Sequence, residues 1–257
     1  MKINDPKVVE EQYANEANLR ARQALWEHKT GIDPKEVLWQ TLVAWQPQRV
    51  LEVGGGQGEL AERMRDELGA EVTFVDISPR MVELARARGV DAREGDAQEL
   101  PFGDGSFDTV VAAWMLYHVP DVDRALAEFA RVLRPGGALI AVTCGDGHTA
   151  ELRELLQYRR ESLAFSRETG EEQIRRHFHE VERMDADVEV TVRQRETLVA
   201  YGDSLSGETL PVPDDLELPC VVHGRTSIFF ATTLSAPRRS SSASATARSC
   251  PTRSSPS

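Results

Sequence analysis

Between residues 49 and 143, short runs of Val, Ile, Leu, Phe and Ala alternate with amphipathic segments of helical length. Such alternation is typical of a parallel sheet whose strands are connected by crossover helices. The predicted strands are residues 49–53, 71–76, 90–94, 107–114 and 138–143. We therefore expect an α/β domain in this part of the chain.

The helices between these strands have recognisable ends. Ser78 followed by Pro79 is typical of an N-cap with proline in the first turn, and Gly89 stands where a helix end favours glycine. Gly69 closes the preceding helix in the same way. Residues 122–133 carry apolar side chains at helical spacing, which predicts a further amphipathic helix.

The regions around this core differ in character. Residues 1–45 are predicted to form an N-terminal helical cover, 46–145 the binding core, 146–234 a lid with closing strands, and 235–257 a disordered Ser- and Arg-rich tail. Within the lid we expect helices at 149–165 and 171–181, a loop at 204–219, and strands at 188–192 and 226–233. The tail differs so much in composition that a shifted reading frame or a cloning artefact is an alternative origin for it.

The charge of the chain is strongly negative and unevenly distributed. The formal net charge is −12, although residues 235–257 contain four arginines and no acidic residue. The rest of the chain therefore carries −16. Binding to nucleic acid normally depends on Lys and Arg that neutralise phosphates, so we expect no nucleic-acid partner.

Hydropathy and cysteine content give expectations about the surroundings of the protein. No stretch approaches the roughly 18 to 20 apolar residues that span a bilayer, and the N-terminus lacks the apolar centre of a secretion signal. We expect no membrane partner and a cytoplasmic location. Cys144, Cys220 and Cys250 lack the spacing of a disulfide framework or a zinc site, so no metal is expected. Monomer and homodimer both stay open.

The turn after the first predicted strand is rich in glycine and reads E-V-G-G-G-Q-G from Glu52 to Gly58. Glycine lets the main chain approach a ligand closely, and ligands of doubly wound sheets bind at this turn. A tight turn without a ligand and a dinucleotide site are the alternatives. The dinucleotide pattern G-x-G-x-x-G fits poorly, because its last glycine would fall on Glu59.

Four further features follow in order along about 95 residues. They are Asp76 after the second strand, Asp96 after the third, the segment 113–121 after the fourth, and R-P-G-G at 134–137 before the fifth. Together with E-x-G-x-G-x-G, this series resembles the class I S-adenosylmethionine-dependent methyltransferases of the small-molecule type, similar to methyltransferase domain 11. The resemblance implies a doubly wound, Rossmann-like, mostly parallel sheet of seven strands, ordered 3-2-1-4-5-7-6, with the last strand antiparallel, an N-terminal helical cover and a lid insertion.

The resemblance also assigns cofactor contacts. Asp76 would accept hydrogen bonds from both ribose hydroxyls, and Asp96 would face the adenine amino group beside the main chain of Ala97. Glu52 would orient the turn or meet the methionine amino group, with capping of the next helix as its alternative. The other predicted cofactor-binding residues are Gly54, Gly55, Gly56, Tyr13 over the methionine end, Ile77 and Met81 beside adenine, and Trp114 in the pocket wall. For Met81 a place in the core is the alternative.

Methyl transfer from a sulfonium needs a nucleophile aligned with the methyl carbon and protected from water. S-adenosyl-L-methionine would be the cofactor, S-adenosyl-L-homocysteine the product, and a small molecule the acceptor at O, N or C. His118 is the candidate general base, and a histidine bonded only to the main chain is its alternative. Trp26, Trp39, Tyr158 and Phe165 are candidates for an apolar acceptor pocket, although helix packing explains them equally well.

Two other functions use the same core. One is an RNA or protein methyltransferase, and the other is a protein that binds the cofactor without catalysis. The acidic composition argues against RNA. Trp114-Met115-Leu116-Tyr117 stands where enzymes that methylate nucleic-acid amines carry Asn-Pro-Pro-Tyr, which also disfavours that chemistry. A dinucleotide-linked oxidoreductase is a remote further alternative.

Overall fold

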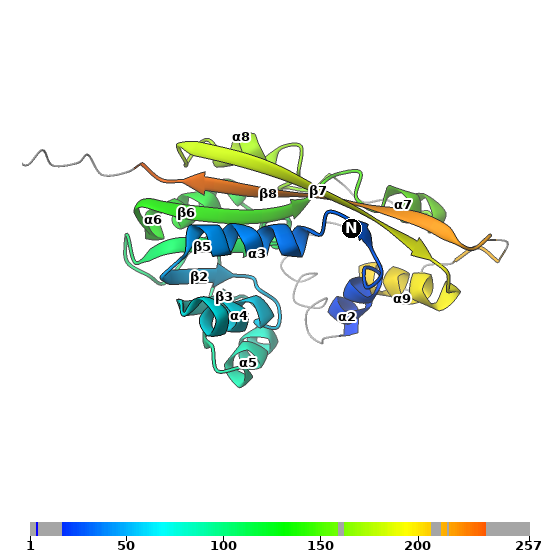
Figure 1. Cartoon of the computed structure of the whole chain (residues 1–257), viewed down its shortest axis with the longest axis horizontal. Helices are drawn as coiled ribbons and strands as arrows, with labels where there is room; N and C mark the ends of the chain where they lie inside the picture. Colours follow the sequence, from blue (N-terminus) through cyan, green and yellow to red (C-terminus); the bar gives the residue numbers. More distant parts are fainter. Residues whose placement is uncertain (1–3, 5–16, 159–161, 207–211, 215, 235–257) are drawn as a thin grey trace, which may run out of the picture.

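The computed structural model describes residues 4, 17–158, 162–206, 212–214 and 216–234. Its centre is a single eight-stranded sheet with the order β1-β7-β8-β6-β5-β2-β3-β4 (Figure 1). The strands are β1 Thr30–Gly31, β2 Arg49–Val53, β3 Glu71–Asp76, β4 Asp91–Glu94, β5 Phe107–Ala113, β6 Leu133–Cys144, β7 Glu180–Val192 and β8 Cys220–Thr232. Strands β2 to β6 pair in parallel, whereas β8 is antiparallel to both β6 and β7. The predicted order of seven strands is confirmed.

The eighth strand, β1, corrects the predicted count of seven. It lies in the segment expected to be a helical cover, and it pairs antiparallel with Val188 and Glu189 of β7. A Cβ atom on Gly31 would lie 2.5 Å from the carbonyl oxygen of Asp187, and this glycine has a φ of +101°. The close approach of the two main chains therefore requires glycine, a local signal that hydrophobic periodicity does not contain.

Helices cover both faces of the sheet. Helices α3 (Pro34–Trp45), α4 (Glu59–Leu68) and α5 (Pro79–Ala87) share one buried cluster with one face. Helices α6 (Val122–Val132) and α8 (Gly170–Ile174) share another cluster with the opposite face. The predicted start of α5 is confirmed, because the Ser78 hydroxyl accepts a hydrogen bond from the Met81 amide.

Strands β7 and β8 extend beyond the other strands. Their register is continuous over thirteen residue pairs, but β6 accompanies β8 only from Thr226 to Thr232. The outer parts, residues 187–192 and 220–225, form a ribbon that β1 flanks at Val188 and Glu189. It shares a third apolar cluster with α7 (Ala150–Leu155), α9 (Arg195–Ser206) and Leu25, which directly follows α2 (Ala17–Ala24). We call the ribbon and these three helices the arm, which lies at the end of the sheet away from α4 and α5 (Figure 1).

Secondary structure in the predicted lid differs from expectation. The helix predicted at 149–165 is limited to α7, and the one at 171–181 is limited to α8, because residues from Glu180 onward pair with β8 instead. Helix α9 occupies the beginning of the loop predicted at 204–219. Within the described ranges, no helix is long and apolar enough to cross a bilayer. The predicted tail from Ser235 lies outside the described residues.

Candidate functional site

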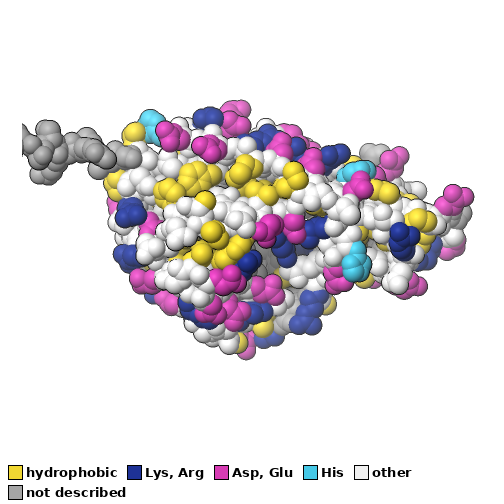
Figure 2. All heavy atoms as spheres, viewed as in Figure 1, with side chains coloured by type: hydrophobic (Ala, Val, Ile, Leu, Met, Phe, Trp, Pro, Cys, Tyr) yellow, Lys and Arg dark blue, Asp and Glu magenta, His cyan; other side chains and the backbone are white. Residues whose placement is uncertain are grey.

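A cavity of about 910 Å³ extends from the carboxyl ends of β2, β3 and β5 to helices α2, α7 and α9 of the arm. This edge of the sheet is where doubly wound folds bind ligands. Figure 2 shows acidic and basic side chains side by side along the recess below the β7–β8 ribbon. The predicted site residues that line the cavity are Glu52, Gly54, Gly55, Gly56, Asp76, Ile77, Asp96, Ala97, Trp114 and His118.

One predicted cofactor residue, Met81, does not line the cavity. Met81 is only 1% exposed in α5 and is not among the lining residues, so the structure corrects its predicted contact to a place in the core. Its neighbour Ile77, by contrast, is 50% exposed and lines the cavity. Tyr13 lies outside the described residues, and its contact stays a prediction.

The glycine-rich turn is shaped by close packing on its inner side. The Gly54 amide donates to the Val75 carbonyl at 2.8 Å, which joins the turn to the end of β3. A Cβ on Gly55 would lie 2.5 Å from Oε1 of Glu52, so this position has no room for a side chain. At Gly56, with a φ of +60°, the single neighbour that a Cβ would meet among the described residues is Leu19, at 3.5 Å. The main chain of Gly56 therefore faces open space, as a surface that receives a ligand requires.

Gly55→Ala is expected to destabilise the protein by about 1–3 kcal/mol and to weaken ligand binding at the turn at least about tenfold. The added methyl group must displace the turn or the buried Glu52 side chain. Gly103→Ala is the matched control, because neither glycine has a positive φ and a Cβ at Gly103 would be in ordinary contact with Ser106 Oγ at 3.7 Å. Urea unfolding and ligand titration of both variants test this, and normal binding by Gly55→Ala would contradict it.

Glu52 is buried at the end of β2 with only 1% of its surface exposed. Burial raises the pKa of its carboxyl to about 8, partly offset by a hydrogen bond from the Ala61 amide of α4, while the nearby charge of Asp76 raises the pKa further. Thus Glu52 does cap the following helix, as its alternative role predicted. Its Oε2 atom, however, has no hydrogen-bond partner among the described residues. A buried carboxyl oxygen without a hydrogen-bond partner in the described protein favours a donor supplied by a ligand.

Asp76 lies at the end of β3, on the same edge as Glu52. Its Oδ1 accepts a hydrogen bond from the Ser78 amide at 2.8 Å, which fixes the orientation of the carboxylate. Burial raises the pKa of Asp76 to about 6, and main-chain bonds from Ser78 and Ile77 limit the rise. At neutral pH the group is therefore a largely ionised, oriented acceptor beside the cavity.

Asp96 follows β4 and is half-buried. Its Oδ1 accepts from the main-chain amide of Gln98 at 2.9 Å, and the side-chain amide of Gln98 lies 3.0 Å from both carboxylate oxygens. Gln98 in turn accepts a hydrogen bond from the amide of Asp121 at the start of α6. Sequence reasoning did not identify Gln98, which links the acid after β4 to the segment after β5.

The segment after β5 is held in an uncommon conformation. Trp114 has a φ of +55°, which is costly for a bulky side chain, while its amide donates to Val142 at 2.8 Å. The next turn is a short 3₁₀ helix, Leu116–His118, in which the rings of Tyr117 and His118 lie 4.5 Å apart. Trp114 and His118 both line the cavity, and the predicted role of His118 as a general base stays a prediction.

The arm supplies the other end of the cavity, and two of the four predicted aromatic residues line it. Trp26 and Tyr158 do so. Trp39 instead packs under the guanidinium of Arg63 at 3.7 Å, and Phe165 is fully buried against Phe229. The pocket role predicted for Trp39 and Phe165 is therefore wrong. Lining residues of the arm that sequence reasoning missed are Arg22, His148, Thr149, Arg153, Val188, Tyr201 and Leu205.

Residues 51–141, about a third of the chain, match the family model described as a methyltransferase domain. The matched segment contains the glycine-rich turn, Asp76, Asp96 and His118, which the structure places around one cavity. Residues 51–141 form a methyltransferase domain. Most of the arm lies outside this methyltransferase domain, either before it in α2 or after it in α7, α9 and the ribbon.

Curated relatives resemble the chain over the same part. A demethylmenaquinone methyltransferase of Thermus thermophilus is 42% identical over 103 residues, which cover 37% of this chain and 47% of the relative. Methyltransferase GfsG of Streptomyces halstedii is 36% identical over 130 residues, 44% of this chain and 47% of the relative. The chain thus spans about half the length of the curated relatives it matches, and the likeness is that of the methyltransferase domain.

Solved structures extend the likeness in fold to most of the chain. Phosphoethanolamine N-methyltransferase 2 of Haemonchus contortus superposes with a TM-score of 0.62 at 20% identity, over 91% of this chain and 60% of that one. The [4+2]-cyclase SpnF superposes with a TM-score of 0.59 at 24% identity, over 90% and 97% of the two chains. These similarities show a Rossmann-like methyltransferase fold that reaches beyond the methyltransferase domain itself.

The methyltransferase domain has the groups that S-adenosylmethionine needs. The unpartnered Oε2 of Glu52 suits an ammonium donor, the oriented carboxylate of Asp76 suits hydroxyl donors, and the open main chain of Gly56 suits close approach. Glu59 and Asp96 add negative charge to this end of the cavity. An acidic surround favours a cofactor that carries a positive sulfonium. The residues present therefore fit this cofactor.

Proposed function

We propose that the chain transfers a methyl group from S-adenosylmethionine to an O, N or C atom of a small molecule. The observation that carries this proposal is the continuity of one cavity from the acids Glu52 and Asp76 to the side chains of the arm. A cofactor at the acidic end leaves the arm end for a second molecule, as a transfer reaction requires. The match of residues 51–141 to methyltransferase domains supports the same reaction.

Each group at the acidic end has a proposed task. Asp76 would hold the ribose, Asp96 and Ala97 the adenine, Ile77 the side of the base, and Glu52 with the glycine-rich turn the methionine part. When bound, the cofactor supplies an activated methyl group on a positive sulfur. The protein then has to align the acceptor and exclude water, which Trp114 and the arm would do from the middle of the cavity.

The proposed roles follow three of the segments that were defined from the sequence. Residues 46–145 would bind the cofactor, while 1–45 and 146–234 would enclose the acceptor. Because most of the arm lies outside the matched domain, the acceptors of the relatives do not transfer to this chain by similarity. Demethylmenaquinone, named for the Thermus thermophilus relative, is nevertheless a sensible first acceptor to assay.

Binding and turnover together test the proposal. Calorimetric titration with S-adenosylhomocysteine should show a single site, and NAD should not bind. Production of S-adenosylhomocysteine from S-adenosylmethionine should then depend on an added small molecule. Binding without acceptor-dependent turnover over a broad panel would favour a non-catalytic cofactor protein, and turnover on RNA or protein would favour the other alternative. Absence of binding would contradict the proposal altogether.

His118→Ala is expected to slow transfer about 10²- to 10⁴-fold if this imidazole removes a proton from the acceptor. The ring lines the cavity beside Tyr117 and is half-buried, which supports this role. Affinity for S-adenosylhomocysteine should change little. The measurement is a single-turnover rate in both proteins as a function of pH. An unchanged rate would leave alignment as the source of catalysis and would assign His118 to the structure of the turn.

A further inference from the structure

The two ends of the cavity differ in charge. The acids Glu52, Glu59, Asp76 and Asp96 lie around the glycine-rich turn. The lining from residues 19–35 and α7 instead carries more basic than acidic side chains: Arg20, Arg22, Lys29, Lys35 and Arg153, against Glu27 and Asp33. Arg22 and Arg153 are half-buried rather than fully exposed. In a chain with a net charge of −12, half-buried arginines gathered at one end of a cavity are unexpected from composition. They indicate that this end receives a ligand of opposite charge.

The position of Arg22 follows from the geometry of α2. Arg22 follows Leu19 by three residues, so the two side chains are neighbours on the surface of α2. Leu19 reaches the glycine-rich turn, since it is a neighbour that a Cβ on Gly56 would meet, and Leu25, directly after α2, packs in the apolar cluster of the arm. Arg22 thus belongs to the part of the arm that lies next to the cofactor end. Its Nη2 donates to the carbonyl oxygen of Ser204 in α9 at 2.5 Å, which fixes the guanidinium there.

Arg153 is held at the arm by a similar contact. Its Nη2 donates to the main-chain carbonyl of Asp146, and its amide donates to Thr149 at 3.1 Å. Thr149 is buried and has a φ of +53°, which is uncommon for a residue with a side chain. Its hydroxyl oxygen accepts a hydrogen bond from the Tyr201 hydroxyl at 3.4 Å. Arg153, Thr149 and Tyr201 all line the cavity. One cation and two hydroxyls therefore converge at this end.

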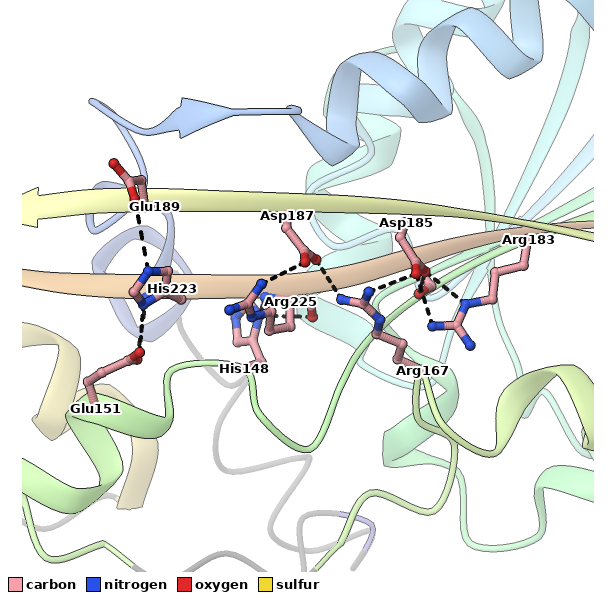
Figure 3. Close-up of polar contacts among 10 residues, drawn as sticks. His148, Glu151, Arg167, Arg183, Asp185, Asp187, Glu189, His223 and Arg225 are labelled. Atoms are coloured by element: carbon pink, nitrogen blue, oxygen red, sulfur yellow. Dashed lines mark hydrogen bonds and ion pairs between the residues drawn. The ribbon is translucent and has the colours of Figure 1, made fainter.

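Acids of the neighbouring ribbon are already bound to other basic groups. Figure 3 shows Asp185 and Asp187 directed towards Arg167, at 2.7 and 2.5 Å, while Arg225 binds the second oxygen of Asp187 at 2.7 Å. His223 lies 2.6 Å from Glu151 and 3.9 Å from Glu189 on the same ribbon (Figure 3). Arg225 and His223 of β8, together with Arg167 before α8, are thus the partners of these acids.

The cavity that the two arginines line also has aromatic and aliphatic side chains in its wall. The rings of Trp26 and His148 lie 5.4 Å apart, and Val188 and Leu163 add aliphatic surface to the same lining. A flat or aliphatic body fits such a wall, while a guanidinium pair suits a carboxylate or phosphate. The low polarity of the wall would strengthen that ionic contact.

We infer that Arg22 and Arg153 bind an anionic group of the acceptor, so that the substrate is a small organic carboxylate or phosphate with an apolar body. This inference rests on the proposed methyl transfer, because it names the acceptor class of the same cavity. The cofactor itself carries a carboxylate on its methionine part. Arg22 is nearer the glycine-rich turn than Arg153 is. The experiments therefore have to test whether Arg22 binds the carboxylate of the cofactor instead of the anionic group of the acceptor.

The test uses protein saturated with S-adenosylhomocysteine and two probes of the same shape, 2-naphthoate and the neutral 2-naphthamide. Binding is followed by calorimetry and by quenching of tryptophan fluorescence. The naphthoate is expected to bind at least about tenfold more tightly than the amide, and Arg153→Gln should remove most of that preference. Arg153→Lys, which keeps the charge, should retain part of it. Arg124→Gln, at an exposed arginine of α6 outside the cavity lining, is the matched control.

Arg22→Gln is measured in addition with S-adenosylhomocysteine and with 5′-methylthioadenosine, which lacks the methionine carboxylate. Loss of affinity for S-adenosylhomocysteine alone would assign Arg22 to the cofactor and overturn its part of the inference. Equal or undetectable binding of naphthoate and naphthamide to the wild-type protein would overturn the whole inference, without need of any variant. Failure of the wild-type protein to bind S-adenosylhomocysteine would instead contradict the proposed function, so the two failures are distinguishable.

Discussion

Asp76→Ala is expected to weaken binding of S-adenosylhomocysteine about 10- to 150-fold, which corresponds to about 1.5–3 kcal/mol. The reason is the loss of an ionised acceptor that β3 places at the cavity and that the Ser78 amide orients through Oδ1. A charged acceptor for two hydroxyl donors contributes more than a neutral one. Isothermal titration of the purified variant at pH 8, above the pKa of about 6 of Asp76, measures the effect.

Two further variants separate ligand binding from local structure. Asp76→Asn keeps the shape and an oxygen for the Ser78 amide, but it loses the charge and one accepting position. It should therefore bind more weakly than the wild type and more strongly than Asp76→Ala. Glu94→Ala is the matched control, because Glu94 is opposite Asp76 in the register of β3 and β4, is exposed, and does not line the cavity. Wild-type affinity in Asp76→Ala would show that the cofactor does not use the end of β3.

Glu52→Gln is expected to stabilise the ligand-free protein at alkaline pH while it weakens cofactor binding. The folded protein raises the pKa of this carboxyl from 4.5 to about 8, so the folded state holds the proton more tightly than the unfolded chain. The stabilising contribution is therefore complete below about pH 4.5 and is lost as pH rises towards 8. Glutamine is uncharged at every pH, so the variant does not lose this stabilisation, which amounts to a few kcal/mol in the free energy of unfolding.

Thermal unfolding of the ligand-free proteins measures this effect. At pH 8.5 the melting temperature of Glu52→Gln should exceed that of the wild type by several degrees, at about 2–4 °C per kcal/mol, and the two should converge near pH 5. Glu94→Gln, at an exposed acid, serves as the control and should follow the wild type. A variant no more stable than the wild type at pH 8.5 would mean that Glu52 is ionised without penalty.

Cofactor binding should show the opposite dependence on pH. A positive group of the ligand favours ionised Glu52, so binding should release a proton between about pH 6 and pH 8, and affinity should rise over that range. Titrations in two buffers with different ionisation enthalpies count the protons released. In Glu52→Gln the part of the release near pH 8 should vanish, and the part near pH 6 that belongs to Asp76 should persist.

The cofactor end of the site was predictable because its residues belong to a strongly patterned core. Strands β2, β3 and β4 ended where the sequence indicated, whereas β6 began at Leu133 instead of at residue 138. Glu52, Asp76 and Asp96 lie at or just beyond the carboxyl ends of β2, β3 and β4. Their convergence is a consequence of parallel pairing, which brings carboxyl ends of strands to one edge. Met81 was different, because helical periodicity places a residue on a buried face without saying whether that face meets a ligand or the core.

The arm was far less predictable, and the reasons are physical. Strand β7 begins at Glu180 with exposed charged residues, so its first half lacks the apolar alternation that predicts a strand. Its pairing comes from β8, a partner nearly forty residues away in sequence. Arg22 and Arg153 stand on short helices whose positions depend on that pairing. Local sequence therefore could not place the two arginines in one cavity.

The β7–β8 ribbon has a consequence for the dimensions of the site. It joins the core to the arm by uninterrupted pairing, and side chains alternate between its two faces. Two residues added to each strand would lengthen it by about 7 Å and keep the same faces turned inward, whereas a single residue would exchange the faces. The length of the ribbon can therefore change only in steps of two residues if the same side chains are to face the cavity. Such a change would alter the length of molecule that fits between the glycine-rich turn and the helices of the arm, without changing the cofactor-binding core.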